Sequence, residues 1–301
     1  MEKYTKRAFP SKAVFILAVG LLAASQSGNL IRIGTAHFIA IAAWRLLLAG
    51  GMMGVVAGRD FKTLKQLTKT DGVLLVAAGC MLAFHFFTWI GAVQHTTVAN
   101  AAMAFSINPV FTAAAAYIFF GEAVSKRLVA SIGTGILGVA VICGGDWSTA
   151  EDHVSGDLLS LLSAVLFTTY LLLGKRLQQK LLTHVYVSVV YSVAALVAFA
   201  AAPLADVEIL HFDTRTWVCF VLMALIPTLI GHTSLNYSLR YFNAGHIAAA
   251  TLVEPLFAGI GAYLAYGEGT SPVFLVGYAF ISISVLLIAL DIRKGAPVKS
   301  T

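Results

Sequence analysis

Two ionisable residues lie inside long apolar stretches of the sequence, where charged side chains are rare. Glu254 follows the run AGHIAAATLV and directly precedes Pro255, and Arg45 lies within FIAIAAWRLLLAG. Charge is costly inside a membrane, so such residues usually face a cavity or a partner. Two arrangements fit: a structural Arg45–Glu254 ion pair, or a cavity in which Glu254 meets an ammonium group and Arg45 a carboxylate. A third use of Glu254 is as a protonated side chain bonded to backbone that Pro255 leaves unpaired.

Polar and aromatic side chains at helical spacing accompany these two residues. His85 and Trp89 are spaced i and i+4 and share one helix face, as do His232 and Asn236. The alternative for each histidine is a hydrogen-bonded place in the core. Two histidines and a glutamate can hold a metal ion, but no close paired spacing such as HExxH occurs, so we predict no metal and no cofactor. The other predicted lining residues are Ser25, Asn29, Phe105, Asn108 and Thr112.

The elements that must position these residues are membrane-spanning helices. Of the 301 residues, 59% are apolar and 11% are charged, and the mean hydropathy is +0.86. Because soluble domains carry about 25% charged residues, we predict an all-α integral membrane protein surrounded by a lipid bilayer. The net charge of +6 arises from basic residues in short loops, so we predict no nucleic-acid partner.

About 20 apolar residues span a bilayer, and on this scale the sequence contains ten transmembrane helices. They are predicted at residues 12–32, 35–57, 72–93, 96–120, 126–145, 156–174, 182–202, 214–239, 244–267 and 271–291. Seventeen lysines and arginines fall on one set of termini and connections, against Arg32 and Arg215 on the other set. Basic loops stay in the cytoplasm, so we expect both termini to be cytoplasmic.

An internal duplication relates the two halves of the chain. Residues 106–122 read SINPVFTAAAAYIFFGE and residues 251–268 read TLVEPLFAGIGAYLAYGE, and a shift of 146 positions superposes Pro109 on Pro255 and Gly121-Glu122 on Gly267-Glu268. We therefore divide the chain into repeats 1–149 and 150–301. Since each repeat has five helices, an odd number, the second enters the membrane upside down relative to the first. Inverted repeats of this kind place a binding site near the membrane midplane, where the halves meet.

The duplicated stretch carries its own structural signals. Pro109 and Pro255 lie near the middle of apolar spans, where a proline removes a backbone hydrogen bond and weakens the helix. We predict that both act as hinges. Gly121 and Gly267 are predicted helix C-termini. The predicted N-cap residues of the helices that follow are Ser125 and Ser271.

The chain resembles the drug/metabolite transporter superfamily, in its ten-helix EamA-type branch, in three features. They are the ten helices in a five-plus-five duplication, the P-(x)11-GE pattern that ends the fourth and ninth helices, and the single arginine of the second helix. The resemblance covers nearly the whole chain. It implies inner-membrane carriers, many of which export amino acids or other small metabolites. The repeats differ in that Glu254 replaces Asn108 and Tyr191 replaces Arg45, so function is expected to depend on this asymmetry.

The resulting hypothesis is a secondary carrier that exports a small metabolite, with amino acids as the best guess, by alternating access. The chain contains no P-loop and therefore no predicted nucleotide hydrolysis. Transport would be driven by protons that exchange at Glu254, or it would proceed by facilitated diffusion down the gradient of the substrate. The alternatives are an efflux carrier for drugs or organic cations, a membrane-embedded enzyme and a channel. No motif with a nucleophile and a base occurs, so we predict no enzymatic activity.

One motif is set aside. Gly133, Gly135 and Gly138 match the spacing of a dinucleotide-binding fingerprint, but no strand precedes them and they lie inside the fifth predicted helix. We expect these glycines to let neighbouring helices approach closely.

Overall fold

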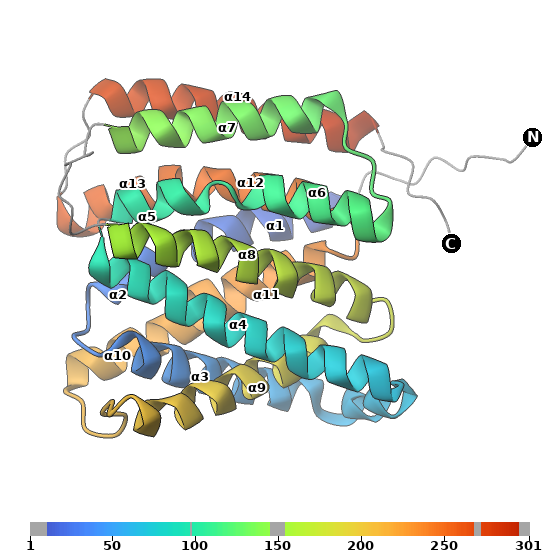
Figure 1. Cartoon of the computed structure of the whole chain (residues 1–301), viewed down its shortest axis with the longest axis vertical. Coiled ribbons are helices and arrows are strands. Elements are labelled where there is room, and N and C mark those ends of the chain that lie inside the picture. Colours follow the sequence, from blue (N-terminus) through green and yellow to red (C-terminus); the bar gives the residue numbers. More distant parts are fainter. Residues whose placement is uncertain (1–10, 97, 145–153, 268–271, 295–301) are drawn as a thin grey trace, which may run out of the picture.

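Ten long helical segments make up the computed structural model, which describes residues 11–96, 98–144, 154–267 and 272–294 (Figure 1). The segments are α1 (Ser11–Ala24) with α2 (Ser27–Ile31), α3 (Phe38–Ala57), α4 (Lys69–His95), α5 (Val98–Phe105) with α6 (Asn108–Phe120), α7 (Lys126–Gly144), α8 (Val154–Leu177), α9 (Thr183–Leu204), α10 (Thr214–Met223) with η3 (Ala224–His232) and α11 (Thr233–Ser238), α12 (Ala244–Ala250) with η4 (Thr251–Val253) and α13 (Glu254–Tyr266), and α14 (Pro272–Lys294). Within the described ranges there is no strand, and nine segments are long and apolar enough to cross a membrane. The predicted all-α membrane fold is confirmed.

The helices pack in a pattern that maps onto itself when the two halves are exchanged. Under the shift of 146 positions, α3 corresponds to α9 and α7 to α14, and each of these pairs packs side by side. Helix α4 packs on α8, and its counterparts η3 and α11 pack on α1. In Figure 1 the α7/α14 pair and the α3/α9 pair form opposite edges of the bundle. The region between them contains the broken helices.

Both duplicated segments are broken at their prolines, as predicted. Helix α6 begins at Asn108 with Pro109 in its first turn, and α13 begins at Glu254 with Pro255 in its first turn. The first turn tolerates proline because its N–H groups have no intrahelical partner. Both helices end at a left-handed glycine, Gly121 (φ 63°) and Gly267 (φ 68°), a conformation that costs glycine nothing.

The predicted N-cap at Ser125 is also present, because its Oγ accepts from the Leu128 N–H at 3.0 Å. The second predicted N-cap, Ser271, lies outside the described residues.

Two interruptions were not predicted. The first segment bends at residues 25–26, where the Ser25 hydroxyl donates to the Leu22 carbonyl at 2.7 Å. The eighth segment widens into a π-helix, η3, around Pro227. Proline cannot donate to the helix ladder, and the side chain of Thr228 instead donates to the Met223 carbonyl at 2.8 Å. A short 3-10 helix, η1 (Gly58–Gln66), fills most of the connection between α3 and α4.

Connections alternate between the two ends of the bundle. Those at residues 58–68, 121–125, 178–182 and 239–243 gather at one end, on the right in Figure 1, and those at 32–37 and 205–213 gather at the other. We call the first the basic end, because Arg59, Lys62, Lys126, Lys180 and Arg240 lie there. The gathering of these loops agrees with the predicted crossing pattern.

Glycines allow α7 and α14 to approach closely. A Cβ on Gly138 would lie 2.8 Å from the Gly277 carbonyl oxygen and 3.0 Å from the Ile281 nitrogen, and a Cβ on Gly135 would meet the Leu252 and Ser284 side chains. Gly133, by contrast, has nothing within 4 Å. The prediction of close helix approach therefore holds for two of the three glycines.

This difference provides a test of α7–α14 packing. Gly138→Ala is expected to lower the melting temperature of the detergent-solubilised protein by about 5 °C, because overpacking against backbone costs about 1–3 kcal/mol. The matched control, Gly133→Ala, is expected to leave it unchanged or slightly raised, since alanine favours helix. Equal melting temperatures for the two variants would contradict the observed packing.

Candidate functional site

A cavity of about 850 Å³, part of it open space, lies between the two halves of the chain. Its wall includes the α1–α2 turn, α4, α8, η3 and the break regions of both proline-containing segments. The wall residues lie from the middle of the bundle toward the end opposite the basic end. Ser25, Trp89, Phe105, Phe167, His232 and Glu254 are among them. The cavity thus lies between the two halves, where the duplication predicts a binding site.

Glu254 is half-buried on the cavity wall, at the start of α13. Within the described part of the chain its carboxyl group has neither a hydrogen bond nor an ion pair, and Arg45 does not contact it. Pro255 beside it also lines the cavity. A carboxyl group without a protein partner is available to a ligand or a proton.

The matching residue of the first half has the opposite environment. Asn108 is fully buried, and its Oδ1 accepts from Thr112 at 2.9 Å and from Thr168 at 2.8 Å. The corresponding positions around Glu254 are Ala258 and Leu22, which offer no hydroxyl. In the first half the amide oxygen is therefore bonded within the protein, although Nδ2 of Asn108 has no partner among the described residues, whereas in the second half Glu254 faces the cavity.

Two histidines and two aromatic residues form much of the remaining wall. The His85 and His232 rings lie 6.1 Å apart, and His85 Nδ1 lies 2.8 Å from the Ser163 hydroxyl. Nδ1 of His232 has no partner among the described residues. The Trp89 ring lies 5.2 Å from that of Phe105. In the described ranges no group of three or more His, Cys, Asp or Glu is arranged to hold a metal ion.

Arg45 does not line the cavity. It is fully buried behind Phe86, a wall residue, with its guanidinium carbon 4.0 Å from the ring centre. Its Nε donates to the Thr228 hydroxyl at 2.9 Å, but Nη1 and Nη2 have no partner in the described part of the protein. A central arginine costs at least about 2.5–3.5 kcal/mol on insertion, and a cation–π contact offsets about 2 kcal/mol. The guanidinium is therefore incompletely satisfied.

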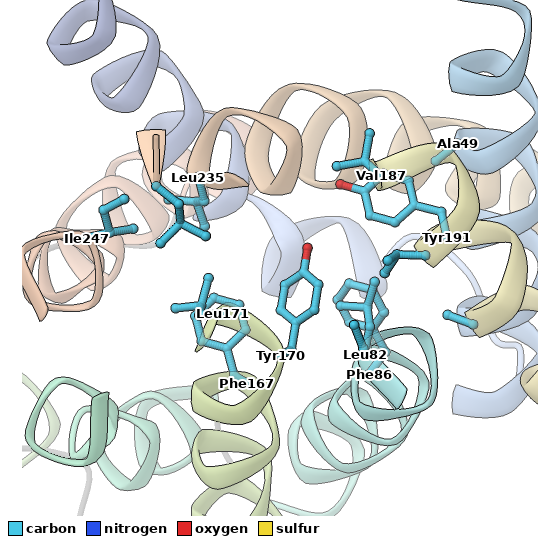
Figure 2. Close-up of a cluster of buried hydrophobic side chains, with 14 of the residues drawn as sticks. Ala49, Leu82, Phe86, Phe167, Tyr170, Leu171, Val187, Tyr191, Leu235 and Ile247 are labelled. Carbon is cyan, nitrogen blue, oxygen red and sulfur yellow. The ribbon is translucent and has the colours of Figure 1, made fainter. Parts of the chain in front are cut away.

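The counterpart of Arg45 in the second half lies close by. The Tyr191 hydroxyl is 3.4 Å from the Thr228 carbonyl oxygen, so the two matching positions meet at the same turn of η3. Figure 2 shows Tyr191 together with Phe86 and Leu82 in the buried cluster around this point. The asymmetry that distinguishes the repeats is thus concentrated near their contact.

Four other predicted residues lie off the cavity wall, and one of them, Thr112, is fully buried and bonded to Asn108. Besides Thr112 and Asn108, they are Asn236, which donates to the Tyr170 hydroxyl and to the His232 carbonyl (2.7 Å), and Asn29, which donates to the Ala258 carbonyl at 2.9 Å. These bonds connect neighbouring helices, so the structure gives both asparagines a packing role beside the cavity.

The basic end of the bundle is closed by polar contacts. Glu122 forms an ion pair with Lys175, and its Oε2 accepts from the Ala244 N–H at 2.9 Å. Lys175 also donates to the Phe242 carbonyl at 2.9 Å. We call these four residues the end latch. Sequence reasoning identified Glu122 only as part of a repeated motif and did not predict its partner.

Apolar side chains close the space between the end latch and the cavity. Figure 2 shows Leu171 of α8 and Leu235 of α11 pointing toward each other, with Ile247 and Tyr170 beside them. Each of these four side chains is at most 1% exposed. The cavity therefore has no continuous passage to the basic end in this conformation.

The separation of Arg45 from Glu254 is testable by stability measurements. In a double-mutant cycle without ligand, the effects of Arg45→Met and Glu254→Gln on the free energy of unfolding are expected to add to within about 0.5 kcal/mol. A coupling energy of several kcal/mol, as a buried ion pair would give, would contradict the observed geometry. The measurement is denaturant unfolding in detergent.

The fold, the duplication and the central cavity define a multi-pass membrane transporter. The model of the EamA-like transporter family matches residues 11–144 and again residues 154–290, and the chain belongs to this family. The transporter named "Uncharacterized transporter" from Archaeoglobus fulgidus is 23% identical over 74% of this chain and 78% of its own length. A protein of Streptantibioticus cattleyicolor, named "Probable terminal-alkyne amino-acid exporter", is 25% identical over 92% of this chain and 93% of its own length.

The fold is also found in a solved crystal structure. It superposes with a TM-score of 0.76 over 95% of this chain and 99% of that chain, at 17% identity. At this identity the similarity concerns the fold alone.

Proposed function

We propose that this protein is a secondary carrier that exports a small amine-bearing metabolite, an amino acid in the leading form of the proposal, by alternating access. The observation that carries the proposal is Glu254, a carboxyl group with no partner among the described residues, on the wall of a cavity where the two halves meet. The exporter of Streptantibioticus cattleyicolor supports amino acids as the substrate class, at 25% identity.

The chemistry of the wall suits an ammonium group. The Glu254 carboxylate is a counter-ion, and the faces of Trp89 and Phe105 attract cations through their π systems. The apolar remainder of the wall suits an aliphatic or aromatic side chain. Binding therefore combines one charge contact with burial of apolar surface.

Alternating access would use the two breaks as hinges. The helix ladders are already interrupted before Pro109 and Pro255, so bending there costs few additional hydrogen bonds. If the basic end faces the cytoplasm of the cell, as we propose for an inner-membrane protein with cytoplasmic termini, the cavity here opens toward the outside. The end latch then closes the cytoplasmic side.

A second candidate function is efflux of organic cations. The described wall of the cavity holds a carboxyl group and aromatic rings but no lysine or arginine. Apart from the imidazoles of His85 and His232, the described wall offers no basic group to a substrate carboxylate in the present conformation. A cationic drug would therefore fit it as well as an amino acid does.

The experiment is uptake into proteoliposomes of the purified protein, with a panel of labelled amino acids, organic cations and nucleosides, with and without an imposed pH gradient. Saturable uptake of amino acids is expected, because a carrier reorients once in each cycle. Uptake that never saturates would indicate a channel, and a chemically altered product would indicate an enzyme. Saturable uptake of cations alone would favour the second candidate.

A further inference from the structure

The least satisfied charged group in the described part of the protein is the guanidinium of Arg45. Its Nη1 and Nη2 are fully buried and have no partner there, and its only hydrogen bond is from Nε to Thr228. An arginine remains charged even when it is buried. A fixed, buried positive charge with two unused donor groups is suited to bind an anion.

A single aromatic side chain separates this charge from the cavity. Phe86 lines the cavity, and the guanidinium covers one face of its ring at 4.0 Å. The ring of His232, the residue that matches Phe86 in the second half, approaches at 5.0 Å in a T-shaped arrangement. Rotation of the Phe86 side chain would therefore expose the guanidinium of Arg45 to the cavity.

The unused donors select a particular class of anion. Nη1 and Nη2 belong to one planar fork, which matches the two oxygens of a carboxylate. The Thr228 hydroxyl accepts from Nε, and the Phe86 ring lies against the guanidinium, so both hold the fork in place. A carboxylate subsite at Arg45 would supply the guanidinium that the described wall of the cavity lacks.

We propose that Arg45 forms a concealed carboxylate subsite, opened by displacement of Phe86, so that the carrier binds a zwitterion between Arg45 and Glu254. This inference rests on the proposed carrier function and specifies its substrate: amino acids bind both groups, whereas simple amines bind Glu254 alone. In the conformation described here the subsite is closed, and the substrate itself completes it.

Chemical labelling tests the subsite without relying on transport. Phenylglyoxal, which modifies arginine, is expected to react with Arg45 at least about tenfold faster in Phe86→Ala than in the unaltered protein, as read by mass spectrometry of the peptide. A mixture of neutral L-amino acids is expected to slow this reaction at least threefold. The matched mixture of their decarboxylated amines is expected to leave its rate unchanged.

The controls separate local exposure from general loosening. Phe84→Ala removes an exposed ring from the same helix and is expected to leave Arg45 labelling unchanged, and exposed Arg215 serves as the internal reference. Unchanged reactivity of Arg45 in Phe86→Ala, or equal protection by amines and amino acids, would overturn the subsite.

Transport supplies the second readout. Arg45→Met is expected to reduce amino-acid uptake at least tenfold and to leave uptake of the matched amines within twofold. Equal loss for both classes, with unaltered melting temperature, would overturn the subsite while leaving the carrier function intact. Absence of uptake by the unaltered protein would instead contradict the proposed function, whatever the labelling shows.

Discussion

Glu254→Gln is expected to reduce substrate uptake by about 100-fold and to remove its dependence on an imposed pH gradient. The carboxyl group has no partner among the described residues, so the substitution is expected to impair binding of the substrate and the proton but not folding. Removing one member of a desolvated charge pair costs about 3–5 kcal/mol, which exceeds the roughly 2.7 kcal/mol that a 100-fold change requires. The measurement is uptake into proteoliposomes with and without the gradient.

Glu208→Gln is the matched control for this result. Glu208 lies in the connection between α9 and α10, where the N–H groups of Leu210 and His211 donate to its carboxylate and lower its pKa to about 2. It is not among the residues that line the cavity, so uptake is expected to be unchanged. Full gradient-driven activity of Glu254→Gln would exclude Glu254 from coupling.

Glu122→Gln is expected to open the basic end. The substitution leaves the partly buried Lys175 without its counter-ion and weakens the acceptor of the Ala244 N–H. Destabilising the closed conformation by about 1.4–2.7 kcal/mol raises the ratio of open to closed molecules by about 10- to 100-fold. A cysteine introduced by Leu171→Cys, on a background without other cysteines, is therefore expected to react at least about tenfold faster with an impermeant maleimide.

A weaker ion pair at the same end provides the control. Asp60 pairs with His184 at 2.9 Å, but both side chains are 30% or more exposed, and such surface pairs contribute about 0–1 kcal/mol. Asp60→Asn is expected to leave the labelling of Leu171→Cys unchanged. Equal acceleration by both substitutions, or none by Glu122→Gln, would show that the end latch does not hold the closed state.

The helices could be predicted from the sequence because their signals are local. Apolar runs of membrane length set the ten segments, and Pro109, Pro255, Gly121 and Gly267 set the breaks and ends, each through its own backbone restriction. The π-helix at η3 was missed because it depends on how Thr228 meets α3 and α9. Such an adjustment is determined by packing, which no local pattern records.

The site was predictable in part for the same reason. Intramembrane charge and helical spacing pointed to Glu254, His85, Trp89 and His232, which line the cavity. They could not show that Phe86 lies in front of Arg45, because the intervening ring comes from another helix. Asn108 was also indistinguishable by type from a lining residue, since only the tertiary structure brings Thr168 to it.

The exchange symmetry of the packing has a consequence for the opposite-facing state. If each half adopts the conformation that the other has now, the cavity closes at its present entrance and opens at the basic end. Each wall residue is then replaced by the one 146 positions away. Three wall residues change in this way: Tyr170 replaces Ala24, Leu171 replaces Ser25 and Leu235 replaces Trp89. The three replacing side chains are those that now separate the cavity from the end latch in Figure 2. Under the same exchange Glu254 gives way to Asn108, so the exit would hold an amide where the entrance holds a carboxyl group, which would favour release of an ammonium group over its rebinding.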